Sequence, residues 1–493
     1  MAQRSVTLGG IVDVPTGLFI DGQWEVAHDG ATVANINPVD GQTLAEVSAA
    51  GSPDVDRAVE AARRQFDSGQ WSSMSGADRA GLLQRLADLM DRDAEKLSTI
   101  QSFENGAPRL AGAMFDVPGS AATLRYFAGW ADKLTGTVIP TPGFMGREML
   151  SYTVRQPRGV MAAIVPWNTP LAASINKLAP ALAAGCTVVL KPSEEAQLAV
   201  HYLGLLIQEA GIPDGTVNIV TGVGQVAGAA LVAHPGVDHI SFTGSPEIGK
   251  QIARTAADSL THVTLELGGK SPQLVFADAD IRRALQDTAT GLFVNQGQIC
   301  AAASRVLVHR DVYREFVDGL GAAAASMRVG DPNVSGNQLG PVISQRQLDR
   351  VLGYIHAGKE EGARLVAGGS RVGSKGFFVE PTIFADATND MTIAREEIFG
   401  PVGTVIPFDD DEHALALAND SAYGLTATVW TSDISRAHSL AHRLRSGTVW
   451  INGWGAVNPA LPWTGFNGSG TGTELGLRGL EEVTEEKVVS VML

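Results

Sequence analysis

Two apolar runs, Val160-Met-Ala-Ala-Ile-Val165 and Thr187-Val-Val-Leu190, flank a stretch with helical spacing at residues 172–184. Short apolar runs bounded by turn residues predict buried strands, and the segment between them predicts a helix. The alternation continues to residue 259, with strands expected at 217–220 and 239–242 and helices expected at 196–210, 225–233 and 248–259. Alternating strands and helices predict a parallel sheet with right-handed crossovers.

A second series with the same alternation begins after Gly268, so we expect a second α/β unit. Its expected strands are residues 273–276, 305–309, 425–430 and 448–451, and its expected helices are 281–293, 312–327 and 434–444. Before the first series, the chain is expected to be extended and then helical, over residues 55–66 and 77–103.

Two β-like segments, residues 135–154 and 487–492, lie outside both series. We expect them to have no partner strand in their own chain. Closed symmetry is the usual way to pair such edges, so the segments predict a homo-oligomer, either a dimer or a dimer of dimers.

Length and charge exclude several classes of protein. The 493 residues suggest roughly three structural units at about 150 residues each. A formal charge of −16 repels phosphate backbones and anionic lipid, which argues against nucleic-acid and membrane-surface partners. Charged residues make up 18% of the chain, below the roughly 25% usual for soluble domains, so much of the surface is expected to be buried.

The compartment is expected to be the cytoplasm. Two cysteines, Cys186 and Cys300, cannot form a disulfide framework and fit a reducing environment. Asp13 and Pro15 interrupt the only apolar stretch near the N-terminus that resembles a signal sequence. The most apolar interior run, residues 159–190, is broken by prolines and by Lys177, so it is not expected to span a bilayer.

A glycine-bounded turn, Gly244-Ser-Pro-Glu-Ile-Gly249-Lys250-Gln251, follows an expected strand and opens an expected helix. Free N–H groups at such a helix start can bind phosphate. A P-loop requires Ser or Thr after the lysine, and Gln251 is a poor substitute. Dinucleotide binding is therefore the better functional interpretation, and a turn without a ligand remains the structural alternative.

Cys300 lies in a polar, glycine-containing loop, Asn295-Gln-Gly-Gln-Ile-Cys300, whereas Cys186 lies in an apolar run typical of a structural cysteine. A catalytic role for Cys300 and a structural one stay open from these residues alone. Glu266 ends an apolar strand just before two glycines, where it is either a general base or a structural carboxylate paired with Lys270.

Metal binding and serine hydrolysis are not expected. His438 and His442 are four residues apart on an expected helix, but arginines crowd that helix and no third ligand is near. The chain contains no G-x-S-x-G nucleophile elbow.

Six motifs together resemble the aldehyde dehydrogenase superfamily, and they occur in that family's order. They are Pro166-Trp-Asn168, Lys191-Pro-Ser-Glu194, Phe242-Thr-Gly244-Ser245, Leu265-Glu266-Leu-Gly-Gly-Lys270, Gln298-Ile-Cys300 and Glu396-Glu397-Ile-Phe399-Gly-Pro401. The resemblance implies a Rossmann-like cofactor domain (residues 1–130 and 155–265), an α/β catalytic domain (266–465) and a β oligomerisation element (131–154 and 480–493).

The resemblance also implies catalytic roles. Cys300 is the nucleophile that forms a thiohemiacetal and then a thioester, and Asn168 with the Cys300 backbone N–H forms the oxyanion hole. Glu266 activates the water that hydrolyses the thioester, and Lys177 supports the site by hydrogen bonding near Glu266. A CoA-acylating relative and a non-catalytic, crystallin-like protein are the alternatives. The presence of Glu266 argues against the first, and intact Cys300, Glu266 and Asn168 argue against the second.

For the cofactor, the resemblance places Lys191 and Glu194 at the adenosine ribose. A carboxylate there repels a 2′-phosphate, which favours NAD over NADP, although Lys191 and Ser193 would tolerate the phosphate if Glu194 moved away. The full expected cofactor set is Trp167, Lys191, Ser193, Glu194, Gly244, Ser245, Leu267, Glu397 and Phe399.

The expected substrate is a small-molecule aldehyde, bulky and either aromatic or alicyclic. Thr169 stands where relatives commonly have a large aromatic residue, and Ala173 and Asn176 follow on the same helix face, where larger side chains are frequent. The expected substrate pocket consists of Thr169, Ala173, Asn176, Val294, Val457 and Trp463. A tunnel closed by inward collapse of neighbouring side chains is the alternative.

Overall fold

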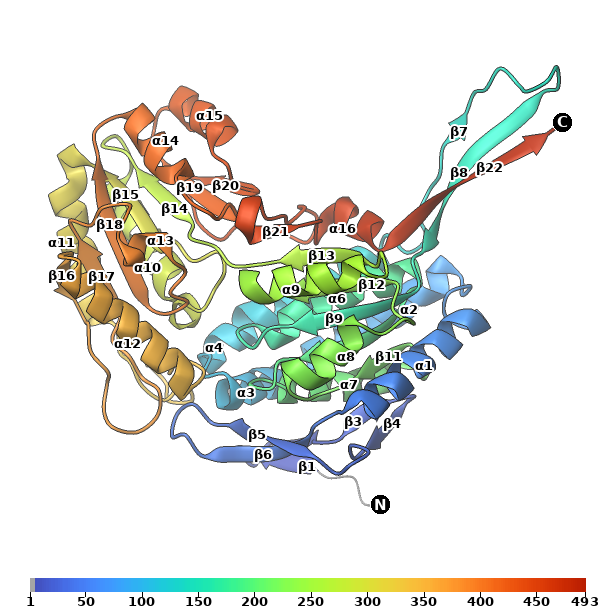
Figure 1. Cartoon of the computed structure of the whole chain (residues 1–493). Helices are drawn as coiled ribbons and strands as arrows, with labels where there is room; N and C mark the ends of the chain where they lie inside the picture. The colour runs from blue at the N-terminus through green and yellow to red at the C-terminus, as the bar shows by residue number, and fades with distance from the viewer. Residues whose placement is uncertain (1–4) are drawn as a thin grey trace.

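A computed structural model describes residues 5–493, which form two α/β units and a β arm that projects from the first unit (Figure 1). The first sheet has the strand order β21-β13-β12-β9-β10-β11-β3-β4. Its strands are β3 (Leu18–Ile20), β4 (Gln23–Glu25), β9 (Val160–Val165), β10 (Thr187–Pro192), β11 (Val217–Ile219), β12 (His239–Thr243), β13 (His262–Glu266) and β21 (Gly470–Thr471).

The central strands β13, β12, β9, β10 and β11 are parallel. In chain order they read 5-4-1-2-3, which is the arrangement of a Rossmann-type sheet, so the predicted fold class is confirmed. The strand order reverses between β9 and β12. Ligands of such sheets bind outside the carboxyl ends of the strands at this reversal, which directs attention to the loops after β9 and β12.

Both faces of this sheet are covered by helices, because both faces of each central strand are apolar. Val160 and Ala162 pack in one hydrophobic cluster, while Met161 and Ala163 pack in the other, as the two-residue period of a strand requires. The surrounding helices are α1 (Ser52–Ser68), α2 (Gly76–Arg92), α3 (Ala94–Glu104), α4 (Arg109–Ala111), η1 (Gly112–Asp116), α5 (Val117–Ala128), α6 (Pro170–Ala184), α7 (Leu198–Ala210), η2 (Gly224–Gly228), α8 (Ala229–Val232) and α9 (Pro246–Ala257).

The helical structure expected over residues 77–103 is present as two helices, α2 and α3, that meet at Asp93. The Asp93 side chain is buried, and it accepts hydrogen bonds from Arg92 and from the Tyr202 hydroxyl at 2.8 Å. Asp93 therefore joins the helix boundary to α7, a tertiary contact that the helical spacing of the sequence does not report.

The second sheet has the strand order β16-β17-β18-β15-β14-β19-β20, and only β16 runs antiparallel to its neighbour. Its strands are β14 (Pro272–Val275), β15 (Arg305–His309), β16 (Arg364–Ala367), β17 (Thr382–Ala385), β18 (Val402–Phe408), β19 (Thr426–Trp430) and β20 (Thr448–Ile451). Its helices and helical turns are α10 (Ile281–Phe293), η3 (Val294–Gly297), α11 (Arg310–Ser326), α12 (Gln345–Glu360), α13 (Thr392–Arg395), α14 (Asp411–Asn419) and α15 (Ile434–Arg443). After β20 the chain returns to the first unit through η4 (Asn467–Ser469) and β21, and α16 (Gly476–Glu482) packs against α6.

Sequence analysis assigned no element between residues 328 and 424, where the structure places α12 and β16 to β18 as well as α13 and α14. Gly403 and Pro407 weaken the strand signal of β18, which is nevertheless a central strand beside β15. The apolar face of α12, with Leu348, Val351 and Ile355 buried, was a recognisable helical pattern that was missed.

The β arm contains β7 (Val138–Ile139), β8 (Met149–Pro157) and β22 (Thr484–Met492). The expectation that its segments lack partners in their own chain is wrong, because β22 pairs antiparallel with β8 from Thr484↔Pro157 to Met492↔Met149. The segments are distant in sequence, so their pairing was not visible from local pattern. Two separate hairpins near the N-terminus pair β1 (Ser5–Leu8) with β2 (Val12–Pro15), and β5 (Thr32–Ile36) with β6 (Thr43–Ser48).

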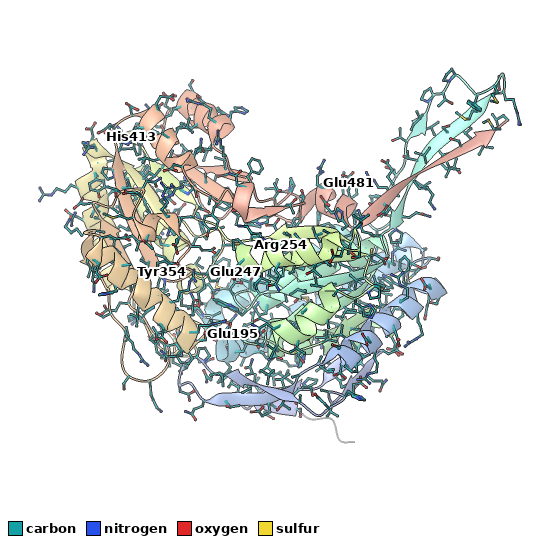
Figure 2. All side chains as sticks on the ribbon, in the orientation of Figure 1. Glu195, Glu247, Arg254, Tyr354, His413 and Glu481 are labelled. Carbon is teal, nitrogen blue, oxygen red and sulfur yellow. The ribbon has the colours of Figure 1, made fainter. Side chains whose placement is uncertain are left out.

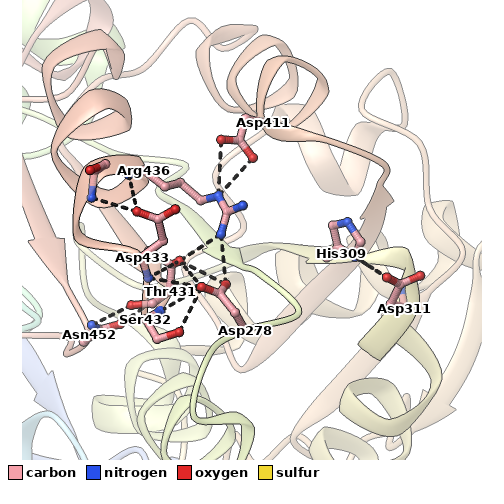
Figure 3. A network of polar contacts seen from close by, with 10 residues as sticks. Asp278, His309, Asp311, Asp411, Thr431, Ser432, Asp433, Arg436 and Asn452 are labelled. Atoms are coloured by element: carbon pink, nitrogen blue, oxygen red, sulfur yellow. Dashed lines mark hydrogen bonds and ion pairs between the residues drawn. The ribbon is translucent and has the colours of Figure 1, made fainter.

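A polar network fixes the carboxyl end of β14 to α14 and α15 (Figure 3). The Asp278 carboxylate accepts hydrogen bonds from the Thr431 hydroxyl at 2.8 Å and from the backbone N–H of Asp433 at 3.1 Å. Arg436 donates to Asp278 at 3.1 Å and to Asp411 at 3.0 Å. These contacts lie at the carboxyl edge of the second sheet, so they stabilise this end of the unit.

The two sheets are joined by residues 267–271, which run from the end of β13 to the start of β14. The carboxyl edge of the first sheet therefore leads into the amino edge of the second. The loop that contains Cys300 precedes β15, and the loop that contains Glu397 precedes β18, so both loops also lie at the amino edge of the second sheet. This junction is where the sequence-predicted site residues meet.

No helix among residues 5–493 combines the length and the apolar character needed to cross a bilayer.

Candidate active site

The cysteine loop has a constrained backbone. Asn295, Gln296 and Gly297 follow one another with φ values of 50°, 58° and 69°, a left-handed run that non-glycine residues rarely adopt. A Cβ on Gly297 would lie 2.2 Å from the Gly400 carbonyl oxygen, so the loop is packed tightly against the segment before β18. These constraints hold Cys300, which is partly exposed, in one position.

Asn168, which follows β9 of the first sheet, is hydrogen-bonded to the same loop. Its side-chain Nδ2 donates to the Gln298 carbonyl at 2.8 Å, and its own carbonyl accepts from the Asn295 side chain at 3.0 Å. The Asn105 side chain donates to that carbonyl as well, at 3.3 Å. Because an amide nitrogen carries two hydrogens, one N–H of the Asn168 side chain is engaged with the loop and the other is left over from this bond.

The environment disfavours the thiolate of Cys300 in the cofactor-free protein. Burial raises the pKa of the Cys300 thiol to about 12, and the carboxyl groups of Glu397 and Glu266 raise it further. A thiol is a weak nucleophile, so this cysteine needs a group that takes its proton.

Glu266 is a buried carboxyl group, 3% exposed, and neither of its side-chain oxygens has a hydrogen-bond partner among the described residues. Burial raises its pKa well above the usual range, and the negative charge of Glu474 raises it further. The structure does not pair it with Lys270, whose Nζ also lacks a partner within residues 5–493. A carboxyl group of raised pKa can act as a general base near neutral pH.

Lys177 was expected to hydrogen-bond near Glu266, and its charge acts to lower the pKa of that carboxyl group. Its Nζ donates to the Ser241 hydroxyl at 2.9 Å and forms an ion pair with Glu474. Glu474 was missed by sequence analysis. The signal that could have identified it is an acidic residue in an otherwise small and apolar segment, Gly470-Thr-Gly-Thr-Glu474-Leu-Gly.

Glu397 contacts the segment that joins the two sheets. Its Oε1 accepts a hydrogen bond from the backbone N–H of Gly269 at 2.9 Å. A Cβ on Gly268 would lie 2.1 Å from Glu397 Oε2, so a larger residue at that position would displace the Glu397 carboxylate. Burial raises the pKa of Glu397 to about 7.

The loop from Glu397 to Phe399 is held by α12. Arg350 donates to the Glu397 carbonyl at 2.8 Å, and Gln347 donates to the Phe399 carbonyl at 2.7 Å. The Phe399 ring lies edge-on to Trp167, with 5.2 Å between ring centroids. The structure thus brings together Trp167 and Phe399, which are 232 positions apart by their residue numbers.

The start of α9 lies after β12, at the reversal of strand order. Ser245 is the N-cap of this helix, and its hydroxyl accepts from the Ile248 N–H at 3.4 Å. A Cβ on Gly244 would lie 2.4 Å from the Phe242 ring, and a Cβ on Gly249 would lie 2.6 Å from the Leu267 side chain. The remaining N–H groups of the first turn of α9 are available to an anion.

The end of β10 carries the residues expected at the ribose. Lys191 Nζ donates to the Pro192 carbonyl at 3.0 Å and lies 3.9 Å from Glu194 Oε2. The Ser193 hydroxyl accepts from the Glu195 N–H at 3.4 Å. Glu195 forms a 3.3 Å ion pair with Arg346 of α12, so this loop contacts the second unit; Figure 2 labels Glu195 together with Glu247 in α9 and Tyr354 in α12.

The residues expected to line a substrate pocket come from separate elements. Thr169 is the N-cap of α6, Ala173 is buried, and Asn176 borders a small cavity together with Lys177. Val294 and Val457 are 36% and 58% exposed. The Trp463 ring lies 6.4 Å from that of Trp450 between centroids, and the neighbouring Trp454 indole donates to the Ala301 carbonyl at 3.1 Å, directly after Cys300.

No group of three or more potential metal-ligating side chains occurs within residues 5–493. His438 and His442 lie on α15 in the second unit.

Comparisons with known proteins were made with the whole chain. The model of the aldehyde dehydrogenase family matches residues 24–489. Retinal dehydrogenase 2 of Mus musculus is 45% identical over 480 residues, which cover 97% of this chain and 92% of that protein. The mitochondrial aldehyde dehydrogenase of Equus caballus is 44% identical over 476 residues, which cover 96% of this chain and 94% of that protein.

Solved structures agree over nearly the full length. The NAD⁺ complex of an aldehyde dehydrogenase from Bacillus cereus has a TM-score of 0.95 at 44% identity, covering 97% of this chain and 96% of that chain. An indole-3-acetaldehyde dehydrogenase of P. syringae, solved with NAD⁺ and IAA, has a TM-score of 0.96 at 41% identity, covering 98% of each chain.

The raised thiol pKa predicts how Cys300 reacts in the cofactor-free protein. Below its pKa of about 12 the thiolate fraction of Cys300 rises about tenfold per pH unit, so alkylation by iodoacetamide should rise without a plateau between about pH 7 and pH 10. Glu397→Gln removes a negative charge and should lower the thiol pKa, which speeds alkylation. This gain should vanish below about pH 7, where Glu397 is itself protonated.

Mass spectrometry of the labelled peptide measures the rate, and Glu396→Gln is the matched control because Glu396 is exposed and bonded to Tyr354. A plateau near neutral pH, or equal rates for Glu397→Gln and the wild type at pH 9, would contradict the assigned environment of the thiol.

Proposed function

Because the chain belongs to the aldehyde dehydrogenase family, we propose that it oxidises a bulky aldehyde to the free carboxylic acid through a covalent intermediate on Cys300, with NAD as hydride acceptor. The observation that carries this proposal is the convergence of Cys300, Asn168 and Glu266 at the junction of the two sheets. Asn168 Nδ2 bonds to the carbonyl of Gln298, two residues before the cysteine, and the charge of Glu266 raises the pKa of the thiol.

In this proposal each part of the chain has its own role. Residues 1–130 and 155–265 bind the cofactor, residues 266–465 supply the cysteine, and residues 131–154 with 480–493 form the oligomerisation element. The Rossmann-type strand order supports the first role, since its reversal lies between the loops that carry Asn168 and Ser245. The position of the cysteine loop before β15 supports the second role.

The site residues fit a dinucleotide. Glu194 offers a partly exposed carboxylate to the hydroxyls of a ribose, and Lys191 lies beside it. The capped start of α9 offers N–H groups to a pyrophosphate, and Glu397 and Phe399 lie at the junction close to Trp167. NAD is favoured over NADP because Glu194 would repel a 2′-phosphate. When bound, NAD supplies the hydride acceptor for the oxidation of the thiohemiacetal.

The first step assigned to the chain is nucleophilic attack. The thiol of Cys300 loses its proton to a carboxylate, and Sγ forms a bond to the aldehyde carbon while the carbonyl π electrons move to oxygen. The free N–H of Asn168 and the backbone N–H of Cys300 stabilise this oxyanion. This stabilisation increases as negative charge develops on the oxygen. The left-handed run before Cys300 and the bond from Asn168 to Gln298 hold these donors in place, so little reorganisation is needed.

The second step assigned to the chain is hydrolysis of the thioester. Glu266 takes a proton from water, the hydroxide adds to the acyl carbon, and the bond to Sγ breaks to leave the thiolate and a carboxylic acid. The raised pKa of Glu266 suits this role because a more basic carboxylate accepts the proton more readily.

The proposal of a bulky substrate depends on small side chains around the site. Thr169, Ala173 and Val294 have small side chains, Ala173 being buried and Val294 36% exposed, and Trp463 supplies an aromatic surface. Apolar space left by small side chains favours a bulky substrate, because filling it gains about 25 cal/mol per Å². Retinal dehydrogenase 2 and indole-3-acetaldehyde dehydrogenase, both similar to this chain, are named for substrates that carry rings. These names support a ring-bearing aldehyde for this protein.

Three substitutions test the catalytic assignments. Cys300→Ala should abolish turnover because the nucleophile is lost. Glu266→Gln should retain a burst of NADH but little steady-state rate, because hydrolysis of the thioester is blocked. Asn168→Ala should lower kcat by about 10²-fold or more as an oxyanion donor is lost, with cofactor affinity unchanged. Stopped-flow absorbance of NADH measures both phases, and an active Cys300→Ala would contradict the assigned nucleophile.

The substrate proposal predicts a ratio of specificity constants. The kcat/KM for phenylacetaldehyde or a terpenoid aldehyde should exceed that for acetaldehyde. Thr169→Phe should selectively lower the value for the bulky aldehyde because the ring fills space beside Asn168, whereas Thr169→Ser is the control that keeps the site open. A clear preference of the wild type for acetaldehyde would contradict the bulky substrate.

The oligomer proposal rests on the β arm, whose exposed apolar residues include Val138, Val488 and Val491. Val488→Glu with Val491→Glu should weaken assembly, because side chains change while the backbone pairing of β22 with β8 stays possible. Multi-angle light scattering measures the mass. Ile434→Glu is the control, since Ile434 is 66% exposed and lies on α15 of the second unit, away from the arm (Figure 1). A wild type that is monomeric at micromolar concentration would contradict the proposal.

A further inference from the structure

A buried asparagine outside the catalytic set contacts the backbone of Asn168. Asn105 is the C-cap residue of α3, and it is 2% exposed. Its side-chain Nδ2 donates to the Asn168 carbonyl at 3.3 Å, and its Oδ1 accepts from the Ala107 N–H at 3.0 Å. One acceptor and one donor of the backbone therefore fix the orientation of the Asn105 amide. The dipeptide Asn105-Gly106 is typical of a turn, so the sequence alone gave no reason to assign Asn105 a role.

The Asn168 carbonyl depends on side chains for its hydrogen bonds. The ladder of α6 begins one residue later, at the Thr169 carbonyl, which accepts from the Ala173 N–H at 2.9 Å. The Asn168 carbonyl instead accepts from Asn105, and from the Asn295 side chain at 3.0 Å. A buried carbonyl needs a partner, and two side-chain donors match its two lone pairs. The peptide that joins Asn168 to α6 is therefore held by Asn105 on one side and by the cysteine loop on the other.

The position of this peptide matters because Asn168 carries the proposed oxyanion donor. Its Nδ2 donates to the Gln298 carbonyl at 2.8 Å, so one N–H is used, and the direction of the other N–H follows from where the Asn168 backbone and the cysteine loop lie. A donor stabilises an oxyanion well only at about 2.7–3.1 Å from the developing charge. A shift of the Asn168 backbone would therefore move this N–H relative to the aldehyde oxygen.

On its N-terminal side, Asn105 is anchored by Glu104. The Glu104 carboxyl group is fully buried, and it accepts hydrogen bonds from the backbone N–H groups of Leu198 at 2.7 Å and Ala199 at 2.9 Å. A helix leaves such N–H groups unpaired in its first turn, so Glu104 acts as a cap for α7. The end of α3 is thereby attached to α7, which follows the loop that is proposed to bind the adenosine ribose.

On its C-terminal side, Asn105 is followed by a tight turn. Gly106 has a φ of 75°, and a Cβ on it would lie 2.9 Å from the Pro341 carbonyl oxygen. A Cβ on Gly340 would lie 2.0 Å from the Gly106 carbonyl oxygen. The turn is therefore packed against the segment that precedes α12 of the second unit. Asn105 lies where both units constrain it, so it has little freedom to follow a displaced Asn168.

We propose that Asn105 is a positioning residue for the oxyanion site, because its amide holds the Asn168 backbone so that the free N–H of Asn168 points at the aldehyde oxygen. This inference rests on the proposed function, in which that N–H stabilises the oxyanion. In the described part of the chain, the Asn105 side chain bonds only to the Asn168 carbonyl and the Ala107 N–H. Asn105 therefore acts on the reaction through Asn168 and not through the nucleophile.

The test measures the rate of the NADH burst in two variants. Asn105→Ala should lower this rate by about tenfold, less than the roughly 10²-fold expected for Asn168→Ala, because the oxyanion donor is misplaced but not removed. Asn105→Asp keeps the oxygen that accepts from Ala107 but places a second oxygen against the Asn168 carbonyl, so its rate should fall at least as far. The affinity for NAD, measured by quenching of tryptophan fluorescence, should be unchanged.

A double-mutant cycle separates positioning from a general loosening of the site. If Asn105 acts through Asn168, Asn105→Ala and Asn105→Asp should each change the burst rate by less than about twofold in the Asn168→Ala background. A further tenfold loss in that background would overturn the inference and indicate a structural role. Alkylation of Cys300 by iodoacetamide needs no oxyanion, so it should keep its wild-type rate in both single variants. A changed alkylation rate would also overturn the inference, because the cysteine loop would then have moved.

Asn218→Ala is the matched control. Asn218 is a fully buried asparagine of β11 whose amide is also fixed by one acceptor and one donor of the backbone. Its Nδ2 donates to the Gly215 carbonyl at 2.9 Å, and its Oδ1 accepts from the Asp21 N–H at 2.9 Å. This variant should keep the wild-type burst rate, and thermal unfolding of all variants shows that the compared proteins are folded.

Reaction with 4-nitrophenyl acetate distinguishes failure of this inference from failure of the proposed function. The ester acylates Cys300 and releases 4-nitrophenolate without aldehyde or cofactor, and its tetrahedral intermediate needs the same oxyanion donor. If no aldehyde is oxidised but the ester burst is about tenfold slower in Asn105→Ala, the proposed function is wrong and the positioning role stands. Wild-type bursts for Asn105→Ala and Asn105→Asp with both the aldehyde and the ester would overturn the positioning role.

Discussion

The close approach of the Gly268-Gly269 segment to the Glu397 carboxylate and to the backbone of Cys300 is the constraint on which the rest of the site depends. A Cβ at Gly268 would meet the carboxylate of Glu397 at 2.1 Å, and a Cβ at Gly269 would meet the Cys300 carbonyl at 2.4 Å. The absence of side chains lets the loops before β15 and β18 lie against the segment that leaves β13. A side chain at Gly269 would force the cysteine loop away from this segment, whereas one at Gly268 would displace the Glu397 carboxylate.

The polarity of the two sheets decides which residues can meet at this junction. The chain leaves the carboxyl edge of the first sheet at Glu266 and enters the amino edge of the second at Pro272. Loops that follow strands in the first sheet therefore face loops that precede strands in the second. This explains why Asn168 and Glu266 come after strands, whereas Cys300 and Glu397 come before them.

Burial of ionisable groups gives the junction its chemistry. Burial raises the pKa of Glu397 to about 7 and lowers that of Lys270 to about 7, and it raises the pKa of Glu266 well above the usual range. Groups whose pKa is moved toward neutrality can exchange protons at low cost.

The sequence by itself determined the alternation of strands and helices from residue 160 to residue 259 and the second series after Gly268, because apolar runs and helical spacing are local patterns. It also placed Asn168, Glu266 and Cys300 at the ends of strands or in a loop, where reactive groups are accessible. Their chemical roles came from the resemblance to a family, since Cys300 and Glu266 each retained a structural alternative on local evidence.

Only the tertiary structure decided the contacts that join distant segments. The pairing of β22 with β8, the ion pair of Lys177 with Glu474, and the support of Glu397 by α12 each connect residues far apart in the chain. The break at Asp93 depends on Tyr202 in the same way. Local periodicity reports which face of an element is buried, but it carries no information about which other element covers that face, and the chemistry of this site arises from those pairings.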